Sequence, residues 1–183
     1  MSNPWVRFAF PETLLTDRLR GERPRPDHAA DMYRLLTDPQ VAARINPTGQ
    51  PFTPEESQGV LDRQLAHWQA HGFSRWMIYD RHTNDLVGNG GVRMSLLEGE
   101  AVIELGYFLM PAFWGQGIAT ELARASVETS FRTLNATAVA AWALPTNQAS
   151  CRVLQKAGMR YERDVLWAER PHALYRVRRG ESR

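Results

Sequence analysis

Apolar and polar positions in the first third of the chain indicate one strand followed by two helices. Residues 14–20 mix apolar and polar side chains in near alternation and predict a first strand. Asp27 is a suitable N-cap for a helix with apolar residues at helical spacing, which Asp38-Pro39 would break or offset. Thr53-Pro54-Glu55-Glu56 predicts a second helix, because a capping hydroxyl precedes a proline and two acids. Apolar residues continue at helical spacing until Gly72, which ends this helix.

The middle of the chain has the pattern of strands rather than helices. Residues 74–80, 86–96 and 102–109 are strand-like. Thr83-Asn84-Asp85 and Glu98-Gly99-Glu100 supply the turns between them. Three strands joined by tight turns predict an antiparallel meander.

Helices and strands alternate in the last third. Residues 118–134 predict a helix, and residues 136–144 form a short apolar run typical of a buried strand. Residues 147–157 predict another helix, closed by a glycine, and residues 159–166 and 172–177 predict a final strand pair. The whole pattern predicts an α+β fold with a mixed, mostly antiparallel sheet of about six to seven strands flanked by about four helices.

Length and composition favour one globular domain spanning residues 1–183. Hydrophobic residues make up 43% and charged residues 23% of the chain, which is ordinary for a soluble protein. No apolar run approaches the roughly 20 residues that span a bilayer, and no signal peptide is visible at the start, so we expect a cytoplasmic protein without a membrane partner. The net charge is only +2, without a basic stripe interleaved with aromatic residues, so we expect no nucleic-acid partner.

The chemistry-bearing segment is a strand that runs through a glycine-containing loop directly into a helix. Gly115 and Gly117 allow a ligand to approach the backbone closely, just before the predicted helix start at Ile118. The first amides of a helix have no carbonyl partner, and the helix dipole adds positive charge, so this loop could hold a phosphate or pyrophosphate. A tight turn before an amphipathic helix is the alternative. A nucleotide P-loop is disfavoured, because no Lys-Ser or Lys-Thr pair follows the second glycine.

A family resemblance decides between these alternatives. Trp114-Gly115-Gln116-Gly117-Ile118-Ala119 resembles the acyl-CoA signature of the GCN5-related N-acetyltransferase (GNAT) superfamily, in which Arg or Gln precedes x-x-Gly-x-Gly/Ala. Trp114 replaces that Arg or Gln, a departure that resembles the RimJ/RimL-type branch. Three further segments match that branch in order and spacing: Leu15-Thr16-Asp17-Arg18-Leu19, Glu104-Leu105-Gly106-Tyr107, and Asn147-Gln148-Ala149-Ser150 with Lys156-Ala157-Gly158.

The resemblance implies where acetyl-CoA would bind. In that family the strand before the loop splays from its neighbour, and the pantetheine arm lies in the gap. Carried onto this chain, backbone groups of Phe108, Leu109 and Met110 would contact the pantetheine and the acetyl carbonyl. Asn147, also a natural N-cap, would contact the pantetheine or an ordered water. The pyrophosphate would be held by the backbone N–H groups of Gly115, Gln116, Gly117, Ile118, Ala119 and Thr120.

Glu104 and Ser150 are the predicted catalytic residues. Glu104 is a carboxylate in an otherwise apolar strand beside the loop, where burial would make it a stronger base for deprotonating an amine, directly or through water. A solvated glutamate or a structural ion pair is the alternative. The resemblance implies that Ser150 lies near the thiol sulfur and donates a hydrogen bond to the departing thiolate, although helix capping would also explain this serine.

The expected reaction is direct transfer of an acetyl group from acetyl-CoA to a primary amine in a ternary complex. Cys151 is the single cysteine, which excludes an intrachain disulfide, and no histidine stands at an obvious partner position for an acyl-cysteine mechanism. The five histidines show no metal-ligand spacing, so no metal is expected. The acceptor could be a protein N-terminus or a small-molecule amine, and a homodimer is possible. The alternatives are a non-catalytic acyl-CoA-binding sensor or scaffold and a nucleotide-binding protein.

Overall fold

One eight-stranded sheet forms the centre of the molecule. The computed structural model describes residues 8–181. The strands lie in the order β1-β2-β3-β4-β5-β6-β8-β7, and every neighbouring pair is antiparallel except β5 and β6, which are parallel. The strands are β1 (Thr13–Leu15), β2 (Leu19–Glu22), β3 (Trp76–Asp80), β4 (Leu86–Leu97), β5 (Glu100–Leu109), β6 (Ala138–Ala143), β7 (Arg160–Trp167) and β8 (Arg170–Arg178).

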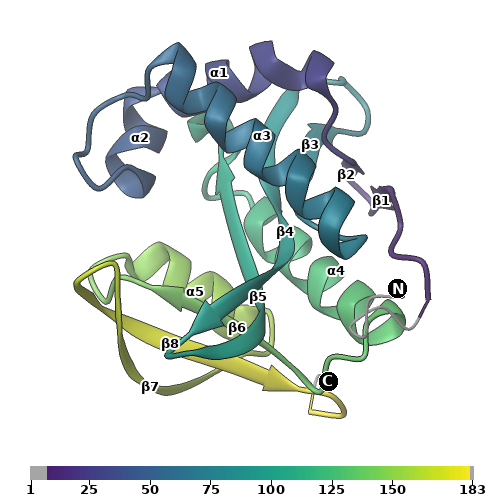
Figure 1. Ribbon diagram of the computed structural model, residues 1–183, viewed down its shortest axis with the longest axis vertical. Coiled ribbons are helices and arrows are strands. Elements are labelled where there is room, and N and C mark those ends of the chain that lie inside the picture. Colours follow the sequence, from purple (N-terminus) through teal and green to yellow (C-terminus); the bar gives the residue numbers. More distant parts are fainter. Residues whose placement is uncertain (1–7, 182–183) are drawn as a thin grey trace.

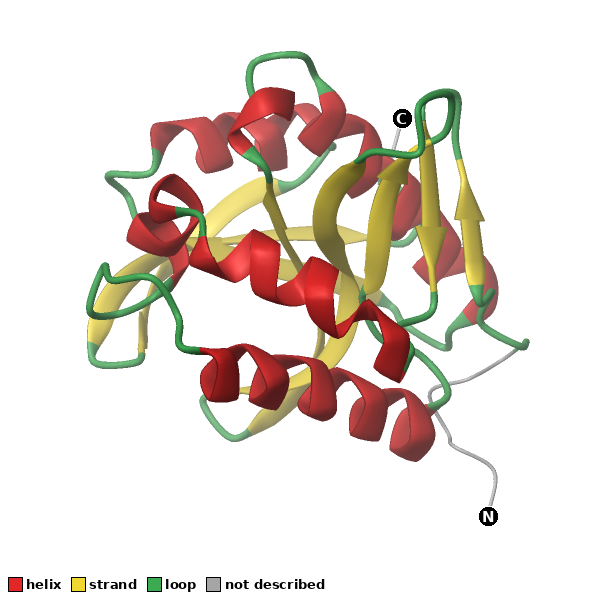
Figure 2. Ribbon diagram, turned by 90° about the horizontal axis from the view of Figure 1, so that it is seen from above, coloured by secondary structure: helices red, strands yellow, loops and turns green. Residues whose placement is uncertain are grey.

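Five α-helices cover both faces of the sheet (Figures 1 and 2). They are α1 (Ala29–Thr37), α2 (Pro39–Ile45), α3 (Pro54–His71), α4 (Ile118–Thr133) and α5 (Gln148–Lys156). The alternation along β3 explains the two layers, because successive strand side chains point to opposite faces. Met77 packs in one core cluster with Met32 of α1 and Leu61 of α3, whereas Trp76 packs in another with Leu122 of α4.

The α+β class and the mixed, mostly antiparallel sheet are confirmed, but the sheet has one more strand than the upper limit predicted. Residues 14–20 do not form a single strand. The Thr16 hydroxyl accepts a hydrogen bond from the Leu19 amide at 3.0 Å, and the Thr16 amide donates to the Leu19 carbonyl at 3.0 Å. This turn divides the segment into β1 and β2, and the two short strands pair with each other.

The helix count is five rather than four because α2 was not predicted. Asp38-Pro39 does not merely break the preceding helix: it starts a new one. The Asp38 carboxylate accepts hydrogen bonds from the amides of Gln40 and Val41, and Pro39 occupies the first helical turn. The predicted N-cap Asp27 is also wrong, because residues 26–28 form a short 3-10 turn and α1 begins at Ala29.

The capping signals around α3 are confirmed. Thr53 accepts a hydrogen bond from the Glu56 amide at 3.2 Å, and the Glu56 carboxylate accepts one from the Thr53 amide at 2.8 Å. Gly72 ends the helix with φ of 75°, in the left-handed region that glycine tolerates best. The meander is also confirmed, with Glu98 and Gly99 both at positive φ in the tight turn between β4 and β5.

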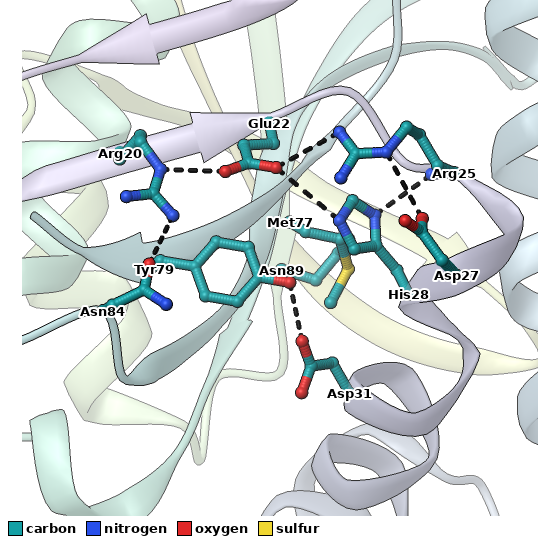
Figure 3. Close-up of polar contacts among 10 residues, drawn as sticks. All are labelled: Arg20, Glu22, Arg25, Asp27, His28, Asp31, Met77, Tyr79, Asn84 and Asn89. Carbon is teal, nitrogen blue, oxygen red and sulfur yellow. Dashed lines mark hydrogen bonds and ion pairs between the residues drawn. The ribbon is translucent and has the colours of Figure 1, made fainter.

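A polar network fastens α1 to the edge of the sheet (Figure 3). The Tyr79 hydroxyl donates to Asp31 at 2.7 Å, and buried His28 lies 3.7 Å from Glu22. The His28 Nδ1 accepts a hydrogen bond from the Arg25 amide at 3.0 Å, and burial is the main reason that the pKa of His28 is lowered. None of the residues drawn in Figure 3 lines either cavity described below, so this network has a structural role.

Candidate active site

The site begins where β5 and β6 part. Their parallel pairing is recorded at one position, Glu104 opposite Ala140. Beyond it, β5 continues to Leu109 among α1 to α3, whereas β6 lies with β7, β8 and α5 (Figure 1). The diverging strands open a gap in the middle of the sheet, as the family resemblance implies.

A cavity of about 800 Å³ extends from this gap to the N-terminus of α4. The first hydrogen bond of α4 runs from the Glu121 amide to the Gly117 carbonyl at 3.0 Å, so the amides of residues 118–120 precede the helical ladder. Gly115 has open space where a Cβ would stand, and Gly117 has a φ of 79°. This cradle fits a pyrophosphate, and among the described residues its lining includes four cationic side chains and no carboxylate. The cations are Arg44, Arg152, Lys156 and Arg170.

Eight of the ten residues predicted to bind acetyl-CoA line this cavity. They are Phe108, Leu109, Gly115, Gly117, Ile118, Ala119, Thr120 and Asn147. Met110 and Gln116 do not line it. The Met110 amide donates to the Val87 carbonyl at 2.8 Å, and the Gln116 side chain donates to the Ala112 carbonyl at 2.6 Å. Asn147 caps α5, because its side-chain oxygen accepts a hydrogen bond from the Ser150 amide at 3.2 Å.

Trp114 links the glycine loop to the end of β5 and to α2. Its indole N–H donates to the Leu109 carbonyl at 2.8 Å, which ties the loop to the end of β5. The Arg44 guanidinium lies 4.3 Å from the centre of the indole ring, within the range of a cation–π contact. The sequence did not reveal Arg44 as a site residue, because it belongs to the unpredicted helix α2.

The segment from Leu15 to Leu19 holds the other side of the glycine loop. The Arg18 guanidinium bonds to the Glu121 carboxylate at 2.6–2.7 Å and donates to the Gln116 carbonyl at 2.9 Å. The Thr16 hydroxyl donates to the same carboxylate at 2.6 Å. Burial raises the pKa of Glu121, but the hydrogen bonds from Thr16 and Arg18 outweigh it and hold the pKa below its ordinary value. Arg18 therefore neutralises a carboxylate in the first turn of the helix that presents the anion cradle.

Replacing Arg18 by Gln is expected to weaken acetyl-CoA binding about three- to tenfold, because an uncompensated Glu121 would repel the pyrophosphate at the helix N-terminus. The double substitution Arg18→Gln with Glu121→Gln should recover part of the affinity. Titration calorimetry with CoA measures both effects. Arg23→Gln is the control, since Arg23 pairs with Glu12 and contacts no residue of the loop. Equal affinity of Arg18→Gln and the parent protein would show that this contact does not tune the cradle.

Glu104 is buried, with two arginines around its carboxylate. Arg75 Nη2 lies 3.2 Å from Oε1, and Arg93 Nε lies 2.6 Å from Oε2. Burial lowers the pKa of Arg75 to about 10, so this arginine stays cationic at neutral pH. The ion pair considered as the alternative is therefore present, while the role of Glu104 as a base stays a prediction. The hairpin turn alone could have predicted one of the two ion pairs of Glu104. With Leu97 opposite Glu100, the strand register places Arg93 opposite Glu104.

A second cavity, of about 500 Å³, contains the Glu104 carboxylate and continues to α3. The two cavities share Tyr107 and Ser150, whose hydroxyl oxygens lie 3.1 Å apart. Burial raises the pKa of Tyr107 to about 12, so its phenol stays protonated at neutral pH. Trp142 and Trp167 also line both cavities, with ring centres 4.7 Å apart. Two hydroxyl groups thus lie at the junction of the cavities.

Cys151 follows Ser150 directly but lines neither cavity. Its side chain packs against the core, and Sγ lies 3.9 Å from the Leu144 carbonyl oxygen. The rings of His67 and His71 contact each other at a tilt, with ring centres 4.3 Å apart. Within residues 8–181, no group of three or more histidine, cysteine or acidic side chains is arranged to hold a metal ion.

Comparisons with known proteins agree with this geometry. Residues 18–160 match the family model described as an acetyltransferase (GNAT) domain. The uncharacterized protein YkkB of Bacillus subtilis is 30% identical over 172 residues, which cover 88% of this chain and 93% of YkkB. Among solved structures, RimL, the ribosomal L7/L12 alpha-N-protein acetyltransferase in complex with coenzyme A, superimposes with a TM-score of 0.76 at 17% identity, covering 91% of this chain and 98% of RimL. The aminoglycoside acetyltransferase AAC(6′)-Ib in complex with coenzyme A gives 0.68 at 20% identity, with 89% and 95% covered.

The matched acetyltransferase model spans well over half of the chain, which shows the family. This chain belongs to the GNAT family, and it is an acetyl-CoA-dependent N-acetyltransferase. None of the helices in residues 8–181 has the length and apolar character needed to cross a membrane.

Proposed function

We propose that the protein transfers the acetyl group of acetyl-CoA directly to a primary amine while both substrates are bound. The observation that carries this proposal is the junction at Tyr107 and Ser150, where the cavity with the anion cradle meets the cavity with Glu104. An extended acetyl-CoA held at the cradle would end with its thioester in the gap between β5 and β6. An amine in the smaller cavity would then meet the thioester without a covalent enzyme intermediate, and joint binding would supply much of the rate.

The two sides of the gap would serve two steps of the reaction. Glu104 and Tyr107 are three positions apart on β5, so their side chains point to opposite faces of the sheet. Glu104, directly or through a water, would accept the proton of the attacking amine on one side. As the C–N bond forms and the C–S bond breaks, Ser150, supported by Tyr107, would donate a hydrogen bond to the leaving thiolate on the other side.

Solved structures with this fold include enzymes named for different acceptors, so the fold by itself does not identify the acceptor of this protein. RimL is named for a protein N-terminus and AAC(6′)-Ib for aminoglycosides. Both a protein N-terminal amine and a small-molecule amine are therefore candidates here. An N-terminal amine, with an ordinary pKa of about 7.7–8.0, needs less help from a base than a lysine amine at about 10.4.

Incubation with acetyl-CoA and a panel of amines and peptides is expected to release free CoA thiol together with an N-acetylated product. Ser150→Ala should lower turnover by roughly 10²-fold, because the thiolate loses its donor. Cys151→Ala is the matched control at the next position, and it should keep most of the activity. Thiol release and product mass measure both effects.

Two results would contradict the proposal. Binding of acetyl-CoA without acetylation of any amine would favour a non-catalytic acyl-CoA sensor. An acetylated Cys151 peptide recovered from protein and acetyl-CoA alone, with Cys151→Ala inactive, would instead establish a covalent mechanism.

A further inference from the structure

The smaller cavity has an excess of positive charge that acetyl-CoA binding does not explain. Its lining includes three arginines, Arg63, Arg75 and Arg93, and among the described residues Glu104 is its single carboxylate. Glu104 is already occupied by Arg75 and Arg93. Three guanidinium groups against one carboxylate leave a formal charge of +2 in the cavity that would receive the acceptor.

The arginines have hydrogen-bond donors to spare. Arg93 donates to Glu104 through Nε, and within residues 8–181 its terminal nitrogens have no hydrogen-bond acceptor. Its side chain is 38% exposed, so a ligand could reach these nitrogens. Arg75 is buried deeper, and its Nε has no hydrogen-bond partner. Arg63 is exposed on α3 at the cavity wall, and no carboxylate of the described chain pairs with it. Arginine presents several N–H donors in a planar fork that suits a carboxylate.

Two histidines, His67 and His172, also line the smaller cavity, and His172 Nδ1 lies 2.9 Å from the Arg170 carbonyl oxygen. His67 Nδ1 lies 2.8 Å from the Phe73 carbonyl oxygen, and His67 Nε2 accepts a hydrogen bond from the Met94 amide at 3.1 Å. Burial is the main reason that the pKa of His67 is lowered, so the ring is neutral at neutral pH. Its nitrogens are engaged with the backbone and are not available as charged contacts for a ligand.

Aromatic side chains also line the smaller cavity. They include Phe52, Trp142, Trp167 and the shared Tyr107. These rings would pack against an apolar body, because aromatic surfaces gain most from burying apolar area. A polycationic acceptor would find cations in this cavity and no free carboxylate to pair with.

From this charge and shape we infer that the acceptor is an amino-carboxylate: a primary amine that carries a carboxylate close to it and an apolar or aromatic body. The carboxylate binds the spare donors of Arg93 and Arg63, which brings the amine toward Glu104 and the gap. A free amino acid and a peptide with an acidic second residue both supply this chemistry. The inference rests on the proposed function and specifies its substrate class.

The test compares three amines of one shape: L-phenylalanine, L-phenylalaninamide and 2-phenylethylamine. Binding to the CoA-loaded protein is measured by calorimetry, and turnover by thiol release from acetyl-CoA. The amino acid is expected to bind at least about tenfold more tightly than either amine that lacks the carboxylate, since a charged hydrogen bond to arginine contributes that much or more. Intrinsic reactivity would give a different order. The amine of phenylalaninamide is less basic than that of phenylalanine, so a larger fraction of it is unprotonated at neutral pH. Peptides that differ only by Asp or Asn at the second position separate a peptide source from a free amino acid.

Arg63→Gln should raise the KM for the amino-carboxylate about three- to tenfold, with little change in kcat and no change for the two amines that lack the carboxylate. Arg132→Gln is the matched control, because Arg132 is also an exposed helix residue, on α4, and lines neither cavity. Equal or tighter binding of the amide or the phenylethylamine would overturn the inference, as would the absence of binding by all three amines and both peptides. Preferred acetylation of an amine without a carboxylate, monocationic or polycationic, would overturn it while leaving the proposed function intact. Failure to acetylate any amine, with CoA still bound, would count against the proposed function itself.

Discussion

Glu104→Gln is expected to lower turnover at neutral pH by roughly 10²-fold or more, because the substitution removes the carboxylate that would accept the proton of the amine. The loss should shrink as the pH rises, since the acceptor amine then deprotonates unaided. The raised pKa of Tyr107, about 12, means that its phenol stays protonated across this range and adds no falling limb to the profile. The pH dependence of kcat/KM for parent and variant measures this effect.

The same substitution should also destabilise the fold by about 1.5–3 kcal/mol, because the Arg75 and Arg93 cations lose their charged acceptor. Glu162→Gln is the matched control. Glu162 is also bonded to two arginines, Arg176 at 2.7 Å and Arg178 at 3.3 Å, but lines neither cavity. A loss of activity in Glu104→Gln that is the same at every pH and follows only the fraction unfolded would remove Glu104 from the proton transfer.

Gly117→Val is expected to abolish the stabilisation that acetyl-CoA gives to the parent protein. A ligand at about 100 times its Kd adds roughly 2.7 kcal/mol to the free energy of unfolding. For a chain of this size that corresponds to a rise in Tm of about 5–10 °C. Gly117 has a φ of 79° at the N-cap of α4, where a branched side chain would shift the backbone and intrude on the amides of the cradle.

Gly99→Val separates this effect from backbone strain. Gly99 has a φ of 85°, has open space where a Cβ would stand, and lies in the β4–β5 turn outside both cavities. Both variants should lose about 1–2 kcal/mol of stability from the left-handed backbone. Only Gly117→Val should lose the thermal shift with acetyl-CoA. No shift in the parent protein at saturating acetyl-CoA would contradict the assignment of the cradle.

Local signals explain what the sequence predicts well. The capping box at Thr53, the turn at Glu98-Gly99 and the glycine loop at Gly117 each act within a few residues, and each is confirmed as a structural element. Asp38-Pro39 shows the limit of such signals, because the same two residues suit both a helix break and a helix start. What decided between them was the packing of Val41 in the core that α1 and α3 form with the sheet.

Long-range pairing explains what the sequence could not predict. The surroundings of Glu104 depend on Arg75, which lies directly before β3, a strand that does not neighbour β5. Arg75 occupies the space above Gly106, where a side chain would collide with it. Nothing near Arg75 in the sequence indicates this contact. The charge of the smaller cavity therefore depends on residues that are distant in the sequence, Arg63, Arg75 and Arg93.

The separation of β5 and β6 should make the behaviour of the sheet depend on whether CoA is bound. Two strands that separate after one paired position leave an internal sheet edge, with peptide groups on both sides that no neighbouring strand satisfies. An amide-containing chain such as pantetheine can act there as a surrogate strand. Loading with CoA should therefore slow hydrogen exchange at residues 105–109 and 141–143 together, on two segments that are distant in sequence. Because an unpaired edge can accept a strand from another chain, we expect CoA also to slow aggregation of the protein.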